Sequence, residues 1–220
     1  ANILFEKTQG PMFAAFQKIV LASTYIELGE MDKANKLLEE MEIAIKDPPM
    51  NHLIPFVQSC FYISEKNWDS FNNVIDEAYT KLHALGLAIM DPSLHGMRAE
   101  YFEDIGDYES AIQWLNTALS LPPLMGHEVT IALYVPLGRI YQTIKDYDKS
   151  EEMFENAMSL TDDNAELFYE YSILKEKQGK DDAARELIMK AYDLYKNGDK
   201  ELELTQKIHS RFEKYQEQLP

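Results

Sequence analysis

Cysteine is the scarcest residue type in this 220-residue sequence, which contains only Cys60. A single thiol cannot form an internal disulfide, so the fold does not depend on an oxidising compartment. No basic neighbour activates the thiol, and Cys60 is expected to be a small buried residue and not a reactive nucleophile. The cytoplasm is slightly favoured as the location, and export after removal of an upstream signal stays open.

Long apolar runs and an excess of basic residues are also absent. No stretch approaches the roughly 18 consecutive apolar residues that a membrane-spanning helix needs, so direct membrane insertion is not expected. Lys and Arg number 21 against 38 Asp and Glu, which gives a net charge of −17. A chain this acidic repels phosphate backbones and anionic lipids, so neither nucleic acid nor a membrane surface is a predicted partner.

Motifs that carry catalysis or metal binding are missing as well. The sequence has no glycine-rich phosphate loop, no serine nucleophile elbow and no pair of histidines one helical turn apart. Adjacent acids such as Glu151–Glu152 and Asp181–Asp182 fall where helices are expected to begin, and acids there favour the helix dipole. We therefore predict no catalytic residue, no metal site and no cofactor, and we predict that the protein is not an enzyme.

What the sequence does contain is a repeated helical pattern, which is clearest between Tyr134 and Leu160. Small and aromatic residues recur there at helical spacing on both sides of a short polar break: Tyr134, Leu137, Gly138 and Tyr141, then Ser150, Phe154 and Ala157. Two amphipathic helices joined by so short a break must pack antiparallel. The small residues Gly138 and Ala157 allow the two backbones to approach closely.

The same layout occurs five times along the chain. Each copy has a glycine or a lysine at the break between its helices: Gly29, Lys66, Gly106, Lys145 and Gly179. The intervals between these turn residues are 37, 40, 39 and 34 residues. Further core positions follow the breaks at helical spacing: Ala34 and Leu38; Phe71, Ile75 and Ala78; Ala111, Leu115 and Ala118; Ala184, Ile188 and Ala191. This layout resembles the tetratricopeptide repeat family, whose unit is a helix–turn–helix of about 34 residues.

The resemblance implies an all-α fold, a right-handed superhelical array of antiparallel helix pairs that forms one domain over residues 1–220. The repeats are expected at residues 15–48, 52–85, 92–125, 131–164 and 165–198. Residues 1–14 are then expected to be the remnant of a preceding helix. Pro55 and Pro136 are expected near the starts of first helices, where a proline is tolerated. Residues 131–135 also indicate a first helix that extends upstream, and Pro136 would kink such a helix.

The C-terminal segment, residues 199–220, carries an apolar stripe at helical spacing that consists of Leu204, Ile208, Phe212, Tyr215 and Leu219. A repeat array needs a solvating end helix, and we favour this capping role for the segment. A coiled-coil stalk that leads to a further domain stays open, although the stripe is shorter than the roughly three to four heptads typical of a coiled coil.

In this repeat family the first helices line the concave face of the array and leave some side chains available to a ligand. Carried onto this sequence, the resemblance implies a partner-binding set that consists of Phe16, Ile19, Ile26, Leu53, Phe56, Ile63, Glu100, Glu103, Arg139, Gln142 and Tyr169. The first six positions are apolar, and Glu100 and Glu103 are acidic. We therefore expect a protein or peptide partner, such as an amphipathic segment with basic residues. The sequence identifies neither the partner nor the oligomeric state.

Chaperone-binding members of the family hold a C-terminal carboxylate with several cations on the concave face. The corresponding positions here carry Arg139 as their single cation, beside Glu100, Glu166 and Glu170. These acids would repel a carboxylate, so no such clamp is expected. The function that the resemblance implies is a non-catalytic scaffold that binds a protein or peptide. The alternative is a sensor or regulatory segment of a larger bacterial signalling or transcription-regulating protein.

Overall fold

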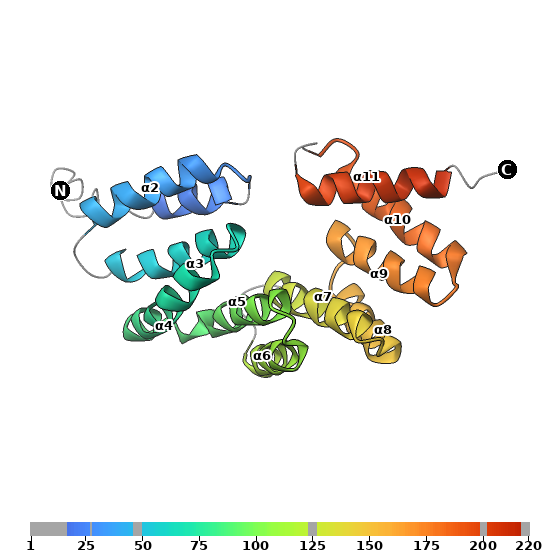
Figure 1. The fold of residues 1–220 in the computed structure, drawn as a ribbon, viewed down its shortest axis with the longest axis horizontal. Coiled ribbons are helices and arrows are strands. Elements are labelled where there is room, and N and C mark those ends of the chain that lie inside the picture. The colour runs from blue at the N-terminus through green and yellow to red at the C-terminus, as the bar shows by residue number, and fades with distance from the viewer. Residues whose placement is uncertain (1–16, 27, 46–49, 123–126, 199–201, 217–220) are drawn as a thin grey trace, which may run out of the picture. The chain divides into compact units, whose positions relative to one another are not determined.

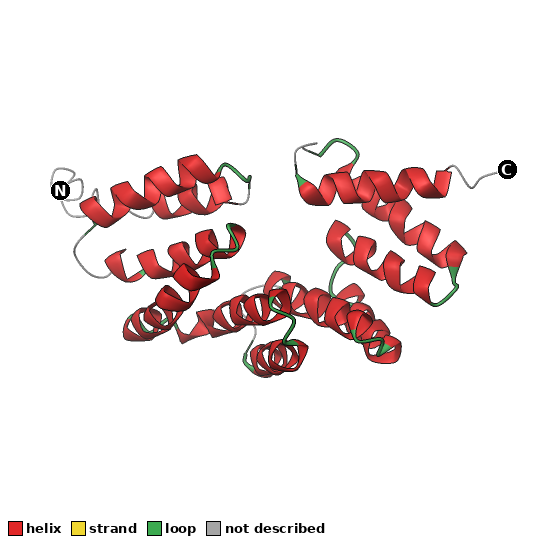
Figure 2. Ribbon diagram, viewed as in Figure 1, coloured by secondary structure: helices red, strands yellow, loops and turns green. Residues whose placement is uncertain are grey.

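The computed structural model of the protein describes residues 17–26, 28–45, 50–122, 127–198 and 202–216. All regular structure in these residues is helical, and no strand occurs among them (Figure 2). In the same ranges, no helix combines the length and the apolar character needed to cross a membrane. The predicted all-α class is confirmed.

Helices follow one another in adjacent pairs along the chain (Figure 1). A helix over residues 17–26 precedes α2 (Met31–Ala44), and α3 (Ile54–Ser64) precedes α4 (Trp68–Ala84). The later pairs are α5 (Asp91–Asp104) with α6 (Tyr108–Ser120), α7 (Glu128–Thr143) with α8 (Tyr147–Met158), and α9 (Ala165–Lys177) with α10 (Asp181–Tyr195). A final helix, α11 (Glu203–Gln216), follows, and short 3-10 turns precede α3 (Met50–His52) and α5 (Ala88–Met90). The predicted array of helix pairs is confirmed.

Each pair turns at the residue that the repeated pattern indicates. The backbone φ angle is positive at all five turn residues: 71° at Gly29, 51° at Lys66, 80° at Gly106, 66° at Lys145 and 71° at Gly179. In three pairs the next residue caps the second helix. The side-chain oxygens of Asn67, Asp107 and Asp146 accept hydrogen bonds from backbone N–H groups three residues on, at 3.1, 3.1 and 3.3 Å.

Contacts divide the chain into two compact units, residues 1–97 and 98–220. The boundary lies inside α5. In the first unit, residues 17–26 pack with α2 and α3, and Ala22, Ala34 and Met41 are fully buried. The α4 residues Phe71, Ile75 and Ala78 are also buried, as their spacing predicts.

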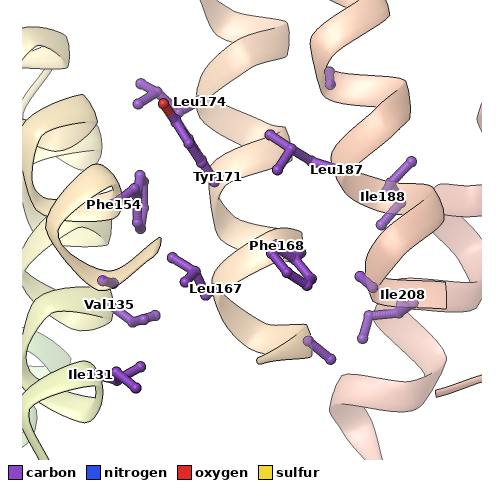
Figure 3. Packing of buried hydrophobic residues seen from close by; sticks show 14 of the residues in the cluster. Ile131, Val135, Phe154, Leu167, Phe168, Tyr171, Leu174, Leu187, Ile188 and Ile208 are labelled. Atoms are coloured by element: carbon purple, nitrogen blue, oxygen red, sulfur yellow. The ribbon is translucent and has the colours of Figure 1, made fainter. Parts of the chain in front are cut away.

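The second unit contains a large core built around α9. Figure 3 shows Val135 of α7 and Phe154 of α8 on one side of α9, with Leu187 and Ile188 of α10 on the other. The rings of Phe154 and Tyr171 lie 5.3 Å apart. Burial of Ser150, Phe154 and Ala157 confirms the helical face predicted from their spacing.

Helices α7 and α8 approach closely at Gly138. A β-carbon built on this glycine would lie 2.6 Å from Cε1 of Phe154, and Ser150 Oγ donates a 2.8 Å hydrogen bond to the Gly138 carbonyl oxygen. Pro55 lies in the first turn of α3, as predicted. Pro136 lies inside α7 instead of near its start, because α7 already begins at Glu128. A proline there leaves the carbonyl four residues upstream without its usual backbone donor.

Helix α11 packs on the preceding helix pair with the stripe that the sequence predicts. Ile208 and Tyr215 are buried, and Leu204 and Phe212 pack against the same core. The Phe212 ring stacks on Tyr192 of α10, with ring centroids 3.8 Å apart. Leu219, the last residue of the predicted stripe, lies outside the described residues. The apolar face of α11 is therefore used within this chain.

Candidate functional site

Three first helices of the second unit, α5, α7 and α9, bring one arginine together with three glutamates. We call this group the acidic site, which consists of Glu103, Arg139, Glu166 and Glu170. Because Gly138 faces α8, the next side chain, Arg139, leaves α7 about 100° further round the helix. Asn164 caps α9 by accepting a 2.8 Å hydrogen bond from the Leu167 N–H. Glu166 thus lies in the first turn of α9, where the helix dipole stabilises an anion.

The guanidinium of Arg139 is bound mainly to Glu103. Its Nε donates to Glu103 Oε1 at 2.8 Å, and its Nη2 donates to Glu103 Oε2 at 2.9 Å. Nη1 donates a longer hydrogen bond of 3.3 Å to Glu166 Oε1. Glu170 Oε1 lies 3.9 Å from Nη1, beyond hydrogen-bonding distance. Glu170 is therefore compensated less well than the other two glutamates.

Burial sets the charge balance of the acidic site. The side chain of Glu170 is 13% exposed, and this burial raises the pKa of its carboxyl although the charge of Arg139 lowers it. Burial lowers the pKa of Arg139, but the hydrogen bonds and charge of Glu103, with the charges of Glu170 and Glu166, outweigh that effect and raise it above its usual value. The guanidinium stays charged, and one cation facing three carboxylates leaves the site negative.

Basic side chains lie beside the acidic site on α11. A shallow, open hollow of about 480 Å³, which we call the basic pocket, is lined by Tyr169 of α9 and by residues of α11: Gln206, Lys207, Ser210, Arg211 and Lys214. The charge of Lys207 lowers the pKa of both Glu170 and Tyr169, although burial raises both and prevails. The basic pocket and the acidic site are therefore electrostatic neighbours within the second unit.

In the first unit, the predicted partner-binding residues lie mostly against the core. Ile19, Ile26 and Phe56 are partly buried and pack on the cluster formed by residues 17–26, α2 and α3. Leu53 precedes α3 and is partly exposed. Ile63 is only 8% exposed, so it is a core residue and does not form part of a surface strip as expected. Phe16 lies outside the described residues.

In the second unit, the structure brings together part of the predicted set. Glu103 contacts Arg139 directly, Glu100 is exposed on α5, and Tyr169 lines the basic pocket. Gln142 is only 3% exposed on α7, which corrects the expectation that it is available to a ligand. It is buried because it lies on the face of α7 that packs inside the unit.

The predicted set omits Glu170, whose buried carboxyl has a raised pKa, and the cations Lys207, Arg211 and Lys214. The three cations do carry a sequence signal, because their spacing of four and three residues places them on one face of a helix. The apolar stripe of residues 199–220 predicts the buried face of a capping helix and does not include these cations.

Comparison with known proteins agrees with this geometry. Residues 92–123 and 131–164 match the family model for the tetratricopeptide repeat. These ranges fall on the pairs α5–α6 and α7–α8. These two segments are therefore similar to the tetratricopeptide repeat, and they lie within a longer series of adjacent helix pairs.

Solved structures with low sequence identity share the fold. A chain of the APC/C hetero-tetramer Cut9–Hcn1 is similar with a TM-score of 0.67 and 16% identity; the match covers 89% of this chain and 35% of that one. PilW, a widely conserved type IV pilus biogenesis factor, has a TM-score of 0.64 and 15% identity, with 94% and 92% of the two chains covered. PilF of Pseudomonas aeruginosa has a TM-score of 0.61 and 18% identity, with coverage of 94% and 86%. This chain thus spans about a third of the Cut9–Hcn1 chain. No curated protein matches the sequence.

Proposed function

We propose that the protein is a non-catalytic scaffold that binds a protein or peptide segment, and that the acidic site receives basic side chains of that segment. The observation that carries the proposal is the incomplete compensation of Glu170. Its carboxylate is mostly buried and lies 3.9 Å from the nearest Arg139 nitrogen. A lysine or arginine of a partner would form a charge-assisted hydrogen bond there and recover part of the free energy lost on burial.

The geometry of the acidic site also favours binding because it is fixed before a partner arrives. Arg139 holds Glu103 through two hydrogen bonds and reaches Glu166 with a third. Carboxylates held in this way lose little side-chain freedom when a cation binds them. Glu100 and Tyr169, which lie on α5 and α9 at partly or fully exposed positions, are included in the proposed surface.

A scaffold role also fits the fold. The neighbours named above include a chain of a hetero-tetramer, that is, a chain within a protein assembly. A stacked array of helix pairs presents first-helix side chains in successive rows, which suits an elongated ligand. Of the predicted partner-binding residues in the first unit, Leu53, Ile19, Ile26 and Phe56 are partly exposed and remain in the proposed surface.

A binding titration tests the proposal. A fluorescein-labelled peptide with lysines and leucines at amphipathic spacing is titrated with the protein, and its anisotropy is measured. Neutralising the site with Glu166→Gln and Glu170→Gln should weaken binding about tenfold, because two charge contacts of a partly desolvated site are lost. The matched control is Glu152→Gln with Glu155→Gln, two exposed acids on α8 that give the same change in net charge.

The control variant should bind within about twofold of the unaltered protein. Equal weakening in both variants would show that the peptide senses only the net charge of −17, and the proposal would be wrong. Circular dichroism of each variant establishes that the helices are intact.

A further inference from the structure

Three cations form a row along α11. Lys207, Arg211 and Lys214 are spaced four and three residues apart, so they share one helix face, and all three line the basic pocket. Seven residues of helix span about 10 Å, which sets the length of the row. The net charge of the chain is −17, so this row is a locally positive part of an acidic protein.

The middle cation is held rigidly. Arg211 Nε donates to Ser172 Oγ at 2.8 Å, while Nη2 donates to the Ser172 carbonyl at 3.1 Å and to Glu176 Oε2 at 2.6 Å. Its side chain is 13% exposed, so these bonds fix the guanidinium against α9. Arg211 therefore supplies a fixed positive charge to the lining of the basic pocket.

The outer two cations, Lys207 and Lys214, are more exposed than Arg211, and their ion pairs within the chain are weak. Lys214 donates to Glu176 Oε1 at 2.5 Å, so a single carboxylate serves both Lys214 and Arg211 and leaves excess positive charge. Lys207 pairs with Glu203 one helical turn away at 2.7 Å. Both lysine side chains are 51% exposed, and exposed pairs of this kind are exchanged easily for an incoming carboxylate.

We propose that the basic pocket binds acidic side chains of the same partner segment whose basic residues occupy the acidic site. This inference rests on the proposed function and deepens it, because it makes the partner bipartite, with lysines or arginines in one part and aspartates or glutamates in the other. An extended chain rises about 3.3 Å per residue, so acidic residues two or three positions apart match the row of cations.

The two charged surfaces fix the orientation of the partner. Tyr169, which lines the basic pocket, directly precedes Glu170 of the acidic site on α9, so the negative and positive surfaces adjoin. A segment placed in the reverse orientation would meet like charges on both, which opposes binding. Tyr169 lies in the pocket wall, and burial raises the pKa of its hydroxyl, which therefore stays protonated and can donate to a carboxylate.

The test compares two labelled peptides by fluorescence anisotropy. The basic probe has lysines and leucines at one end and alanines at the other. The bipartite probe is identical except that two of the alanines, two positions apart, are aspartates, and each probe is made in both chain directions. Simple attraction to an acidic protein predicts weaker binding of the bipartite probe, because its positive charge is smaller. We expect it to bind about fivefold more tightly in one direction, since it adds two ion pairs on the row of cations, which includes the fixed charge of Arg211.

A variant with reversed charge in the basic pocket tests whether this pocket causes the tighter binding of the bipartite probe. Lys207→Glu with Lys214→Glu should abolish the advantage of the bipartite probe and leave binding of the basic probe no weaker. The matched control is Lys190→Glu on α10 with Lys196→Glu directly after that helix. The two lysine side chains are 48% and 50% exposed, and they pair with Glu186 and Asp193 at 3.1 and 3.2 Å. This control should keep the advantage.

Each result decides between the two proposals. If both probes bind the unaltered protein equally, or the basic probe binds more tightly, the basic pocket does not accept acidic side chains and the inference is wrong, while the proposed function stands. If neither probe binds, both are wrong. Loss of the advantage in the control variant as well would assign it to overall charge and overturn the inference.

Discussion

At the scale of single residues, the turn positions were the most predictable feature of the chain. A glycine or lysine between two helical stripes indicated each turn, and all five residues adopt positive φ angles. At Lys145 the turn is closed by a 2.9 Å hydrogen bond from the Asp146 N–H to the Tyr141 carbonyl. Lysine in this conformation is strained, because its β-carbon crowds the neighbouring carbonyl.

Replacing Lys145 by glycine should therefore stabilise the protein. Relief of left-handed strain outweighs the extra freedom of glycine in the unfolded chain, and we expect a gain of about 0.5–1 kcal/mol in the free energy of unfolding. Denaturant titration followed by circular dichroism measures it. The reverse change, Gly106→Ala, should cost about 1–2 kcal/mol from backbone strain alone, since no atom lies within 4 Å of the added β-carbon. A neutral or destabilising Lys145→Gly would show that the turn is not strained.

The close approach at Gly138 makes a second prediction at this scale. The new β-carbon of Gly138→Ala would lie 2.6 Å from Cε1 of the buried Phe154 ring. We expect a loss of about 1–3 kcal/mol, as is usual for overpacking. Phe154→Leu makes room at the contact, so the double variant should lose less than the sum of the two single changes. If the stability losses of the two single variants add up in the double variant, the strain of Gly138→Ala does not come from its contact with Phe154.

Glu151 is a residue whose role the sequence did not show. It was interpreted as an acid at a helix start, but its carboxylate accepts hydrogen bonds from Lys175 and, at 2.8 Å, from Gln178, and it lies 3.5 Å from Lys180. These partners belong to the next helix pair, and repeat spacing alone does not reveal which of its side chains lie opposite. The Lys175 hydrogen bond is the main reason why the pKa of Glu151 falls from 4.5 to about 2, against the opposing effect of burial.

This lowered pKa makes stability depend on pH in a defined window. The folded state binds the proton of Glu151 less readily than the unfolded chain, so the contribution is present above pH 4.5 and is lost as the pH falls towards 2. After allowance for solvent screening, we expect Glu151→Gln to cost about 1 kcal/mol at pH 7. The difference between the two proteins should shrink to near zero at pH 2. A difference that does not change with pH would exclude an ionic role for Glu151.

At the scale of helices, the apolar periodicity of α11 predicted its buried face but not its polar contacts with α9. The apolar stripe correctly indicated the buried face, with Ile208 fully buried and Tyr215 4% exposed. Periodicity did not indicate the polar attachment, in which Arg211 donates hydrogen bonds to Ser172 and Glu176 of α9. Contacts of that kind depend on the angle at which two helices cross, which a spacing pattern does not specify.

The packing of α11 can be tested by removing its central anchor. Ile208→Ala should destabilise the protein by about 2–4 kcal/mol, because a cavity forms in the core shared with α9 and α10. Glu213→Ala, at an exposed position of the same helix, should change stability by no more than about 0.5 kcal/mol. Chemical denaturation measures both. If the two variants are equally stable, α11 does not stabilise the preceding pair.

Helix starts and surface assignments were less predictable than core faces. Pro136 was expected near the start of a first helix and lies within α7, because helical structure continues upstream to Glu128. Ile63 and Gln142 were assigned to the ligand face and are buried. First helices in such arrays contact several neighbours, so a side chain that avoids its own partner helix can still be covered by the next pair.

At the scale of the whole molecule, composition indicated the sign of the surface but not its pattern. The net charge of −17 indicates a mostly acidic surface, and Glu103, Glu166 and Glu170 lie together around Arg139. The sequence did not reveal that Glu170 is under-compensated or that cations of α11 lie beside it. Both features arise at α9, where Glu170 lies near Arg139 of α7 and Tyr169 lines the basic pocket with residues of α11.

The central claim is that a partner binds the acidic site on the first helices of the second unit. It is tested most directly by recording ¹⁵N-resolved NMR spectra of the intact chain during titration with the unlabelled basic peptide. We predict that the largest amide shift changes map to α5, α7 and α9, around Glu103, Arg139 and Glu170, and that they are reduced in the Glu166→Gln, Glu170→Gln protein. Shift changes confined to the second helices α6, α8 and α10, or unaffected by neutralising the site, would contradict the account.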